Sequence, residues 1–309
     1  MKYPATTHSS AIDCTEPVRN YIRQSVSENT RRAYRADLAH FQAWGGVIPA
    51  TDVMVAEYLA GYAESLSIAT LSRRLASLSK AHSVKGLTSP TKSELVKSTM
   101  RGIKRMHAKP QAVAKPLLVE DLLRIMPLLS DDMKGIRDRA LLLIGFAGGF
   151  RRSELVAINC TDLEWVRQGL VVHLRRSKAD QEGKGRKIGI PYARGRWCPV
   201  VSLKTWLEAT GIEHVPVFRP ITRHGLVGGN RLSAEAVNGV IKDCVEIIGM
   251  NRADFSGHSL RAGLATSAAQ AGVATWKIRQ QTGHASDAML ARYIRDGEIF
   301  TDNAAGRLL

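Results

Sequence analysis

Apolar residues recur every three or four positions over most of residues 16–106, which is the spacing of amphipathic helices. The clearest run is SENTRRAYRADLAHFQAW at 27–44, where Phe41 and Trp44 continue one apolar stripe that starts at Tyr34. Similar runs follow to residue 106 without an extended segment between them. The pattern predicts a helical N-terminal domain.

Polar residues at the expected helix starts support this prediction. Ser27 and Thr51 each stand just before a periodic run, where a hydroxyl can accept a hydrogen bond from the free backbone amides. Thr91 with Glu94 three residues later fits a capping box before the last helix of this part.

The apolar pattern changes twice after residue 117. Three extended segments, LEWV at 163–166, GLVVHLR at 169–175 and KIGIPY at 187–192, interrupt the helical spacing. Gly183 and Gly185 mark a turn between the last two, so we expect a hairpin. Helical runs surround these strands at 119–129, 136–146, 200–209 and 233–248. The sequence therefore predicts a mainly α protein with a small antiparallel sheet, of the α+β class.

Two segments without regular periodicity divide the chain. Residues 1–15 read as a leader, and residues 107–116 include HAKPQAVAK between helical runs. Pro110 and Pro116 break the helical pattern there. We expect a helical domain at 16–106, a linker at 107–116 and a second domain at 117–309.

The charge balance indicates a polyanionic partner. The chain has 44 basic and 28 acidic residues, a formal net charge of +16. Residues 1–110 hold 16 basic and 8 acidic side chains, which leaves 28 and 20 for the remainder, so both parts carry an excess of 8. Nucleic acid held from two sides is the first interpretation, and an acidic membrane surface is the second.

Other sequence features narrow the protein class. The longest apolar run, ALLLIGFAGGF at 140–150, is too short to cross a bilayer, and the first residues lack a signal-peptide core. The four scattered cysteines fit reduced thiols in the cytoplasm better than a disulfide or zinc framework. We expect a cytoplasmic protein without a membrane association.

Arginines in the helical N-terminal part fall away from its apolar stripes. One interpretation is a solvated helix face; the other, which the net charge favours, is a DNA-facing surface. The candidate DNA-binding residues are Arg31, Arg32, Arg35, Arg73 and Arg74.

The stretch 256–296 concentrates the chemistry of the chain. His258 and Arg261 are three residues apart, so on a helix they share a face. His284 follows a Thr-Gly pair that resembles a helix end, and Tyr293 lies nine residues further on. Taken singly, each has an ordinary structural explanation. Together they offer a cationic fork for phosphate, two proton carriers and a nucleophile.

A second basic site precedes the predicted sheet. Arg151 in AGGFRRSEL stands at a helix start, where free amides and the helix dipole add to its charge toward an anion. Glu154, one turn on, is suited to orient an arginine or a histidine. The hairpin tip SKADQEGKGRK carries Lys178, Lys184, Arg186 and Lys187; each is either a solvated charge or a candidate acid for a leaving oxygen.

These motifs resemble the tyrosine recombinase (phage integrase) family over nearly the whole chain. GFRRSEL, RRSKAD, HSLR, TGH and ARYIR stand in that family's order, and 27–44 resembles the opening of its helical core-binding domain. The short leader leaves no room for the arm-binding domain of larger phage integrases. Phe150 stands where the family more often has Leu, and register assigns the catalytic arginine to Arg151 rather than Arg152.

The resemblance implies a mechanism and a set of roles. Tyr293 would attack the scissile phosphate and form a 3′-phosphotyrosyl link, with a Holliday junction between the two strand exchanges. The implied catalytic residues are Arg151, Lys178, His258, Arg261, His284 and Tyr293, with Glu154 in support. No cofactor and no metal are expected.

The implied partners are double-stranded DNA with an inverted-repeat site and three further copies of the chain, in a homotetramer. The resemblance also allows an accessory protein or a second recombinase. Integration and excision, or resolution of a mobile element or plasmid, are the expected tasks. A type IB topoisomerase-like enzyme and a non-catalytic DNA-binding module are the alternative classes.

Overall fold

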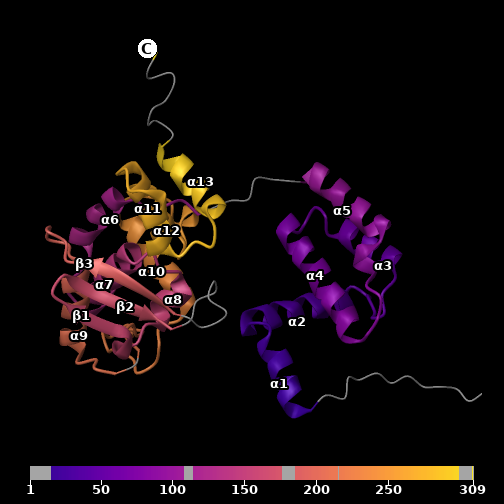
Figure 1. The fold of residues 1–309 in the computed structure, drawn as a ribbon, viewed down its shortest axis with the longest axis horizontal. Coiled ribbons are helices and arrows are strands. Elements are labelled where there is room, and N and C mark those ends of the chain that lie inside the picture. Colours follow the sequence, from indigo (N-terminus) through magenta and orange to yellow (C-terminus); the bar gives the residue numbers. More distant parts are fainter. Residues whose placement is uncertain (1–14, 108–113, 176–184, 215, 299–307, 309) are drawn as a thin grey trace, which may run out of the picture. The chain divides into compact units, whose positions relative to one another are not determined.

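The structure, a computed structural model, describes residues 15–107, 114–175, 185–214, 216–298 and 308 (Figure 1). The chain divides into two compact units, Met1–Gln111 and Ala112–Leu309. The described parts are mainly helical with one small antiparallel sheet, which confirms the predicted fold class.

The first unit is a bundle of helices. Its elements are α1 (Glu16–Gln24), α2 (Glu28–Ala43), α3 (Asp52–Gly61), α4 (Ile68–Val84), the 3₁₀ turn η1 (Pro90–Lys92) and α5 (Glu94–His107). Ser27 and Thr51 cap α2 and α3 as predicted, since their hydroxyls accept from backbone amides of the first turn. The predicted cap at Thr91 is wrong. Thr91 lies within η1, and Ser93 Oγ accepts the amide of Val96 in its place, 3.3 Å away.

A buried polar network lies beside the apolar core of this bundle. The core itself packs Phe41, Tyr58 and Leu71 with neighbouring aliphatic side chains. Arg74 is 7% exposed and donates to the Tyr58 hydroxyl over 2.7 Å. His40 is a further neighbour, and its Nδ1 lies 3.0 Å from the same nitrogen of Arg74. The structure thus corrects the interpretation of Arg74 as a DNA-facing residue, because its guanidinium is enclosed by its own domain.

The second unit surrounds the sheet with helices. Before the sheet lie α6 (Val119–Ile125), η2 (Met126–Leu128), α7 (Met133–Ala147), α8 (Arg152–Ala157) and η3 (Cys160–Asp162). After it lie α9 (Pro199–Thr210), α10 (Ala234–Ile247), η4 (Arg252–Asp254), α11 (Ser259–Gln270), α12 (Thr275–Thr282) and α13 (Asp287–Glu298).

The sheet has the order β1–β2–β3, with both pairs antiparallel. Its strands are β1 (Leu163–Val166), β2 (Gly169–Leu174) and β3 (Arg186–Pro191). Leu170 pairs with Ile190 and Val172 with Ile188, and all four side chains are buried. This alternation turns one face of the hairpin toward the protein core.

Helix α7 forms the centre of the second core. Five consecutive residues, Ala140–Ile144, are buried, so the helix is enclosed on several sides. The apolar run at 140–150 therefore belongs to a protein core. None of the described helices combines the length and apolar character needed to cross a membrane.

Helix α11 approaches the chain near Leu117 at Gly263. A Cβ added to Gly263 would lie 1.7 Å from the Leu117 carbonyl oxygen. The same residue is hydrogen-bonded to the start of α11, since the Leu117 amide donates to the Ser259 carbonyl over 3.0 Å. The helix carrying Arg261 can pack this closely only because residue 263 has no side chain.

We expect Gly263→Ala to destabilise the protein by about 1–3 kcal/mol or more, because the backbone itself must shift to admit the methyl group. Gly239→Ala is the matched control: Gly239 lies within α10 with no atom near the position of an added Cβ. The control should be neutral or gain about 0.5–1 kcal/mol. Urea unfolding followed by circular dichroism measures both; equal stabilities of the two variants would contradict this account of the packing.

Candidate active site

Arg261 is buried inside the second unit. It lies in the first turn of α11 and is 1% exposed. Its Nη1 donates to the carbonyl oxygens of Gly149, over 2.9 Å, and Thr282. Its Nη2 is buried and has no hydrogen-bond partner among the described residues. This nitrogen is suited to take a further acceptor, such as a phosphate oxygen.

Arg151 approaches the same point from the start of α8. Its backbone amide and its Nη1 both donate to the Glu154 carboxylate, over 2.9 and 2.5 Å. Its Nη2 lies 3.4 Å from the Gly283 carbonyl oxygen. Glu154 is almost fully buried, so it orients Arg151 from inside the protein. The next residue, Arg152, pairs with the Glu235 carboxylate over 2.9 Å.

His258 and Tyr293 meet across α11 and α13. His258 stands immediately before α11, and its Nε2 lies 2.7 Å from the Tyr293 hydroxyl oxygen. The Tyr293 ring also packs on a small apolar cluster that includes Ala265, Ile278 and Leu290. The ring of this tyrosine is therefore part of a small core, and its hydroxyl is presented to a histidine.

His284 completes the group. Helix α12 ends at Thr282, and Gly283 adopts a positive φ of 66°, so the chain reverses there as predicted. His284 is 6% exposed and its Nδ1 lies 2.7 Å from Thr282 Oγ1. Its ring centroid is 5.7 Å from that of Tyr293. The structure thus brings together five of the six predicted catalytic residues: Arg151, His258, Arg261, His284 and Tyr293.

Burial and the surrounding cations favour the neutral forms of both histidines. Burial, followed by the charges of Arg261 and Arg151, lowers the pKa of His284 to about 3. Burial, followed by the same two arginines, also lowers the pKa of His258. Burial lowers the pKa of Arg261 to about 10, which still leaves it charged at neutral pH. A neutral His258 is able to accept the proton of the Tyr293 hydroxyl.

The sixth predicted residue, Lys178, lies outside the described residues. Among the described residues of the hairpin, Arg186 lies at the site. Its Nη1 donates to the Gln281 carbonyl over 3.1 Å, and its Nη2 is 3.8 Å from Glu154. The sequence analysis named Arg186 as one of four hairpin cations, each either a solvated charge or a candidate acid for a leaving oxygen. Its position at the first residue of β3, facing α12, depends on a tertiary contact.

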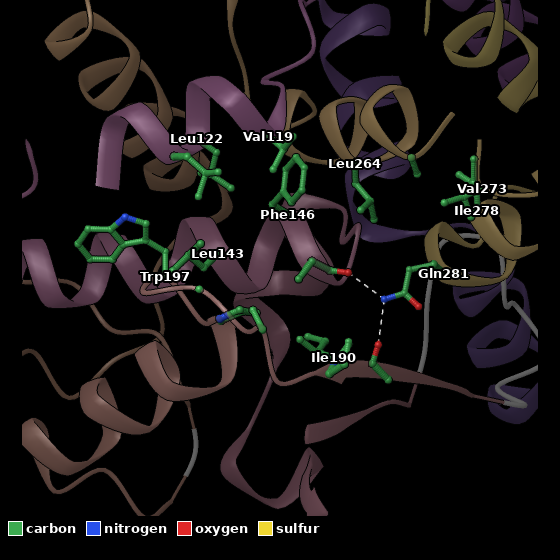
Figure 2. A pocket seen from close by; sticks show the side chains of 18 of the residues that line it. Val119, Leu122, Leu143, Phe146, Ile190, Trp197, Leu264, Val273, Ile278 and Gln281 are labelled. Carbon is green, nitrogen blue, oxygen red and sulfur yellow. Dashed lines mark hydrogen bonds between the residues drawn. The ribbon is translucent and has the colours of Figure 1, made fainter. Parts of the chain in front are cut away.

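Gln281 is a further residue that the sequence analysis missed. Its Nε2 donates to the Ala147 carbonyl over 2.8 Å and to the Gly189 carbonyl over 3.1 Å, which ties the end of α7 to β3 (Figure 2). It borders an apolar cavity of about 760 Å³ that is lined by side chains such as Leu122, Phe146, Trp197 and Leu264 (Figure 2). The polar bridge fixes the segment that precedes Gly283 and His284.

A smaller hollow of about 440 Å³ opens beside His258. Its lining includes Arg151, Arg152, Ser153, Asn238 and Ser256. Asn238 Oδ1 accepts the Gly257 amide over 2.6 Å and so holds the loop before α11. The hollow gives an anionic chain room next to the catalytic groups.

The other predicted DNA-binding residues differ in their surroundings. Arg73 bridges to the buried Asp37 over 2.8 Å while its side chain is 48% exposed. Arg31 and Arg35 both pair with the exposed Glu28. Arg32 is exposed and donates to Asn29 over 2.6 Å. These four stay predictions for DNA contact.

Among the described residues, no group of three or more His, Cys, Asp and Glu side chains is placed to hold a metal ion. The expectation of a metal-free reaction stays a prediction.

We expect acidification to destabilise the DNA-free protein through His284. In the unfolded chain this side chain takes up a proton near its ordinary pKa of 6.5, whereas the folded protein keeps it neutral to about pH 3. The unfolded state therefore binds more protons between these values, and stability falls as the pH falls. From pH 6.5 to 5 the loss is about 2 kcal/mol.

Urea unfolding at several pH values measures this effect. His284→Gln should reduce the slope of the free energy of unfolding against pH. His214→Gln, at an exposed histidine, should leave that slope as in the wild type. Equal slopes in His284→Gln and wild type would show that His284 is not held neutral.

Comparison with known proteins agrees with this geometry. The model of the phage integrase family matches residues 115–298, and that of the phage integrase N-terminal SAM-like domain matches residues 20–85. An integrase/recombinase XerD homolog of Selenomonas ruminantium is 38% identical over 297 residues, 93% of this chain and 87% of the relative. The recombinase Cre of Escherichia phage P1 is 25% identical over 299 residues, 89% of this chain and 86% of Cre.

The fold agrees as well. The solved structure of a lambda integrase tetramer bound to a Holliday junction is similar with a TM-score of 0.61 at 18% identity, over 89% of this chain and 74% of that chain. The family match alone covers more than half of the 309 residues. The chain therefore belongs to the phage integrase family, the tyrosine recombinases, a class of DNA strand-exchange enzymes.

Proposed function

We propose that this chain is a site-specific recombinase that cleaves and rejoins DNA through a covalent link to Tyr293. The observation that supports this role most directly is the 2.7 Å contact between the Tyr293 hydroxyl and His258 Nε2. A phenol is a weak nucleophile at neutral pH, and an adjacent neutral imidazole activates it by accepting its proton. The product is a 3′-phosphotyrosyl bond and a free 5′-hydroxyl.

Three groups are proposed to stabilise the charge that develops on the phosphate. Arg261 offers its unpartnered Nη2, and Arg151 is held beside it by Glu154. His284 adds a third donor when it is protonated. Because these groups are fixed before the substrate arrives, little reorganisation is needed during the reaction.

Lys178 is proposed to protonate the leaving 5′-oxygen, with the other hairpin cations as alternatives. The phosphotyrosyl bond keeps the energy of the broken phosphodiester, so the 5′-hydroxyl of a partner strand can reseal it without ATP. No cofactor and no metal are assigned to this reaction.

The proposed assembly is a homotetramer on two inverted-repeat DNA sites, which exchange one pair of strands at a time through a Holliday junction. The similar lambda integrase structure is a tetramer bound to a Holliday junction, which supports this arrangement. An accessory protein or a second recombinase is a further proposed partner.

The proposed task is integration and excision, or resolution, of a mobile element or plasmid, in the cytoplasm. The free thiols of Cys160, Cys198 and Cys244 fit a reducing compartment. The proposed domain limits are 16–106 for the core-binding domain and 117–309 for the catalytic domain.

Tyr293→Phe should keep DNA binding and lose cleavage, because it removes only the nucleophilic oxygen. Purified protein is incubated with fragmented DNA from the source organism and its mobile elements, and covalent adducts are captured under denaturing conditions and sequenced. Tyr192→Phe, at an exposed tyrosine that follows β3, is the matched control and should form adducts as the wild type does.

The location of the adducts separates the alternatives. Adducts at one inverted-repeat site support a site-specific recombinase, and adducts without site preference indicate a topoisomerase-like activity. An undiminished adduct in Tyr293→Phe would remove Tyr293 from its role. Tight DNA binding with no adduct from the wild type would point to a binding module.

Arg32 and Arg35 are expected to contact DNA phosphates. Replacing both by Gln should weaken binding and flatten the dependence of log K on log salt by about one unit for each lost contact. Arg101→Gln changes another exposed arginine of the same unit and serves as the control. A double variant with the wild-type slope would exclude these two arginines from the interface.

A further inference from the structure

Thr282 contacts two of the proposed phosphate-binding residues at once. It is the last residue of α12 and is fully buried. Its backbone carbonyl accepts from Arg261 Nη1. Its hydroxyl oxygen lies 2.7 Å from the Ile278 carbonyl oxygen and 2.7 Å from His284 Nδ1. A buried hydroxyl with two such close neighbours has only one arrangement of hydrogens that satisfies both.

The donors and acceptors can be counted. A hydroxyl carries one hydrogen, and the Ile278 carbonyl can only accept. At 2.7 Å the two oxygens need that hydrogen between them, since their lone pairs would otherwise face each other. Thr282 therefore donates to Ile278 and presents a lone pair to His284. The hydrogen on that second contact must come from Nδ1.

We propose that Thr282 is a positioning residue of the active site, whose hydroxyl holds His284 in the tautomer that carries its hydrogen on Nδ1. This inference rests on the proposed role of His284. With Nδ1 committed to Thr282, Nε2 is the nitrogen that gains and loses a proton. Thr282 thereby decides which edge of the ring exchanges protons with the reacting groups.

With this tautomer, the charges around His284 decide when Nε2 takes up a proton. Arg151, Arg186, Arg261 and His258 all disfavour a proton on His284, and the Tyr293 ring is its aromatic neighbour. In the DNA-free protein, Nε2 is therefore a bare acceptor. An anionic phosphate placed among the same groups reverses this balance, so that Nε2 takes up a proton and donates it as a hydrogen bond to a phosphate oxygen. The opposite tautomer would carry its hydrogen on Nε2 and leave the lone pair of Nδ1 facing a lone pair of the Thr282 hydroxyl, with no hydrogen between them.

The tautomer is measurable without any DNA. Full-length protein with ¹⁵N-labelled histidine is studied by NMR at pH 7, and His284→Gln assigns the His284 signals. We expect a protonated Nδ1 and a bare Nε2 in the wild type. Thr282→Val, which keeps the shape and removes the hydroxyl, should shift His284 toward the Nε2–H tautomer, and Thr282→Ser should restore the wild-type pattern. A wild-type Nε2–H tautomer, or a wild-type pattern in Thr282→Val, would overturn the proposal.

Thr266→Val is the matched control. Thr266 is also buried, at 3% exposure in α11, but its hydroxyl has no hydrogen-bond partner among the described residues. It should leave the imidazole spectrum unchanged. If Thr266→Val altered the His284 tautomer as much as Thr282→Val does, the effect would be one of packing and the specific role of Thr282 would be lost.

Single-turnover formation of the covalent adduct gives the functional readout. Thr282→Val should form the adduct about 10- to 100-fold more slowly, as losses of supporting hydrogen bonds around an active site commonly do, with little change in DNA affinity. Thr282→Ser should recover most of the rate, and Thr266→Val should keep it. A wild-type rate in Thr282→Val would count against the positioning role. An absence of adduct from the wild type would instead refute the proposed function, while the NMR result would still decide the tautomer.

Discussion

The buried guanidinium of Arg261 is the constraint on which the catalytic unit depends. A charge at 1% exposure is costly unless acceptors offset the loss of water, and here two backbone carbonyls accept from Nη1 of Arg261. One carbonyl belongs to Gly149, after α7, and the other to Thr282, at the end of α12. Three chain segments far apart in sequence therefore converge on one side chain. Gly149 adopts a positive φ of 58°, which explains the glycine just before Phe150 and Arg151.

Local sequence predicted most elements of the fold, because the determinants of those elements are local. Hydroxyl caps at Ser27 and Thr51, the glycine reversal at Gly283 and the alternation of β2 and β3 are all encoded within a few residues. The capping prediction at Thr91 failed because Pro90 starts a 3₁₀ turn and a second hydroxyl, Ser93, competes two residues later. Two adjacent capping candidates cannot be ranked without the tertiary path of the chain.

Site residues that belong to motifs were predicted from the sequence, whereas residues whose role depends on tertiary contacts were not. Arg151, Arg261, His258, His284 and Tyr293 were identified from motif order and resemblance, and the structure brings them together. Arg74 and Arg73 are neighbours on α4, yet only Arg74 is buried. The partners of Arg74, Tyr58 and His40, lie 16 and 34 residues away, so the local sequence does not reveal this burial. Thr282 and Gln281 were missed for the same reason: their hydrogen bonds join distant elements or depend on burial, neither of which periodicity reveals.

The active site holds more positive charge than its own acids balance. Arg151 and Arg186 lie beside one carboxylate, Glu154, and the buried Arg261 adds a further positive charge. Burial, followed by the charges of Arg261 and Arg151, lowers the pKa of both histidines and favours their neutral forms. Like charges at short range in a buried site repel strongly, so the DNA-free arrangement stores unfavourable electrostatic energy. A phosphate anion placed there offsets the repulsion among the arginines, so its binding is favoured by the loss of that repulsion. The same fold interactions that bury Arg261 thus make the site selective for an anion, and they leave the protonation of His284 to be set by whether that anion is present.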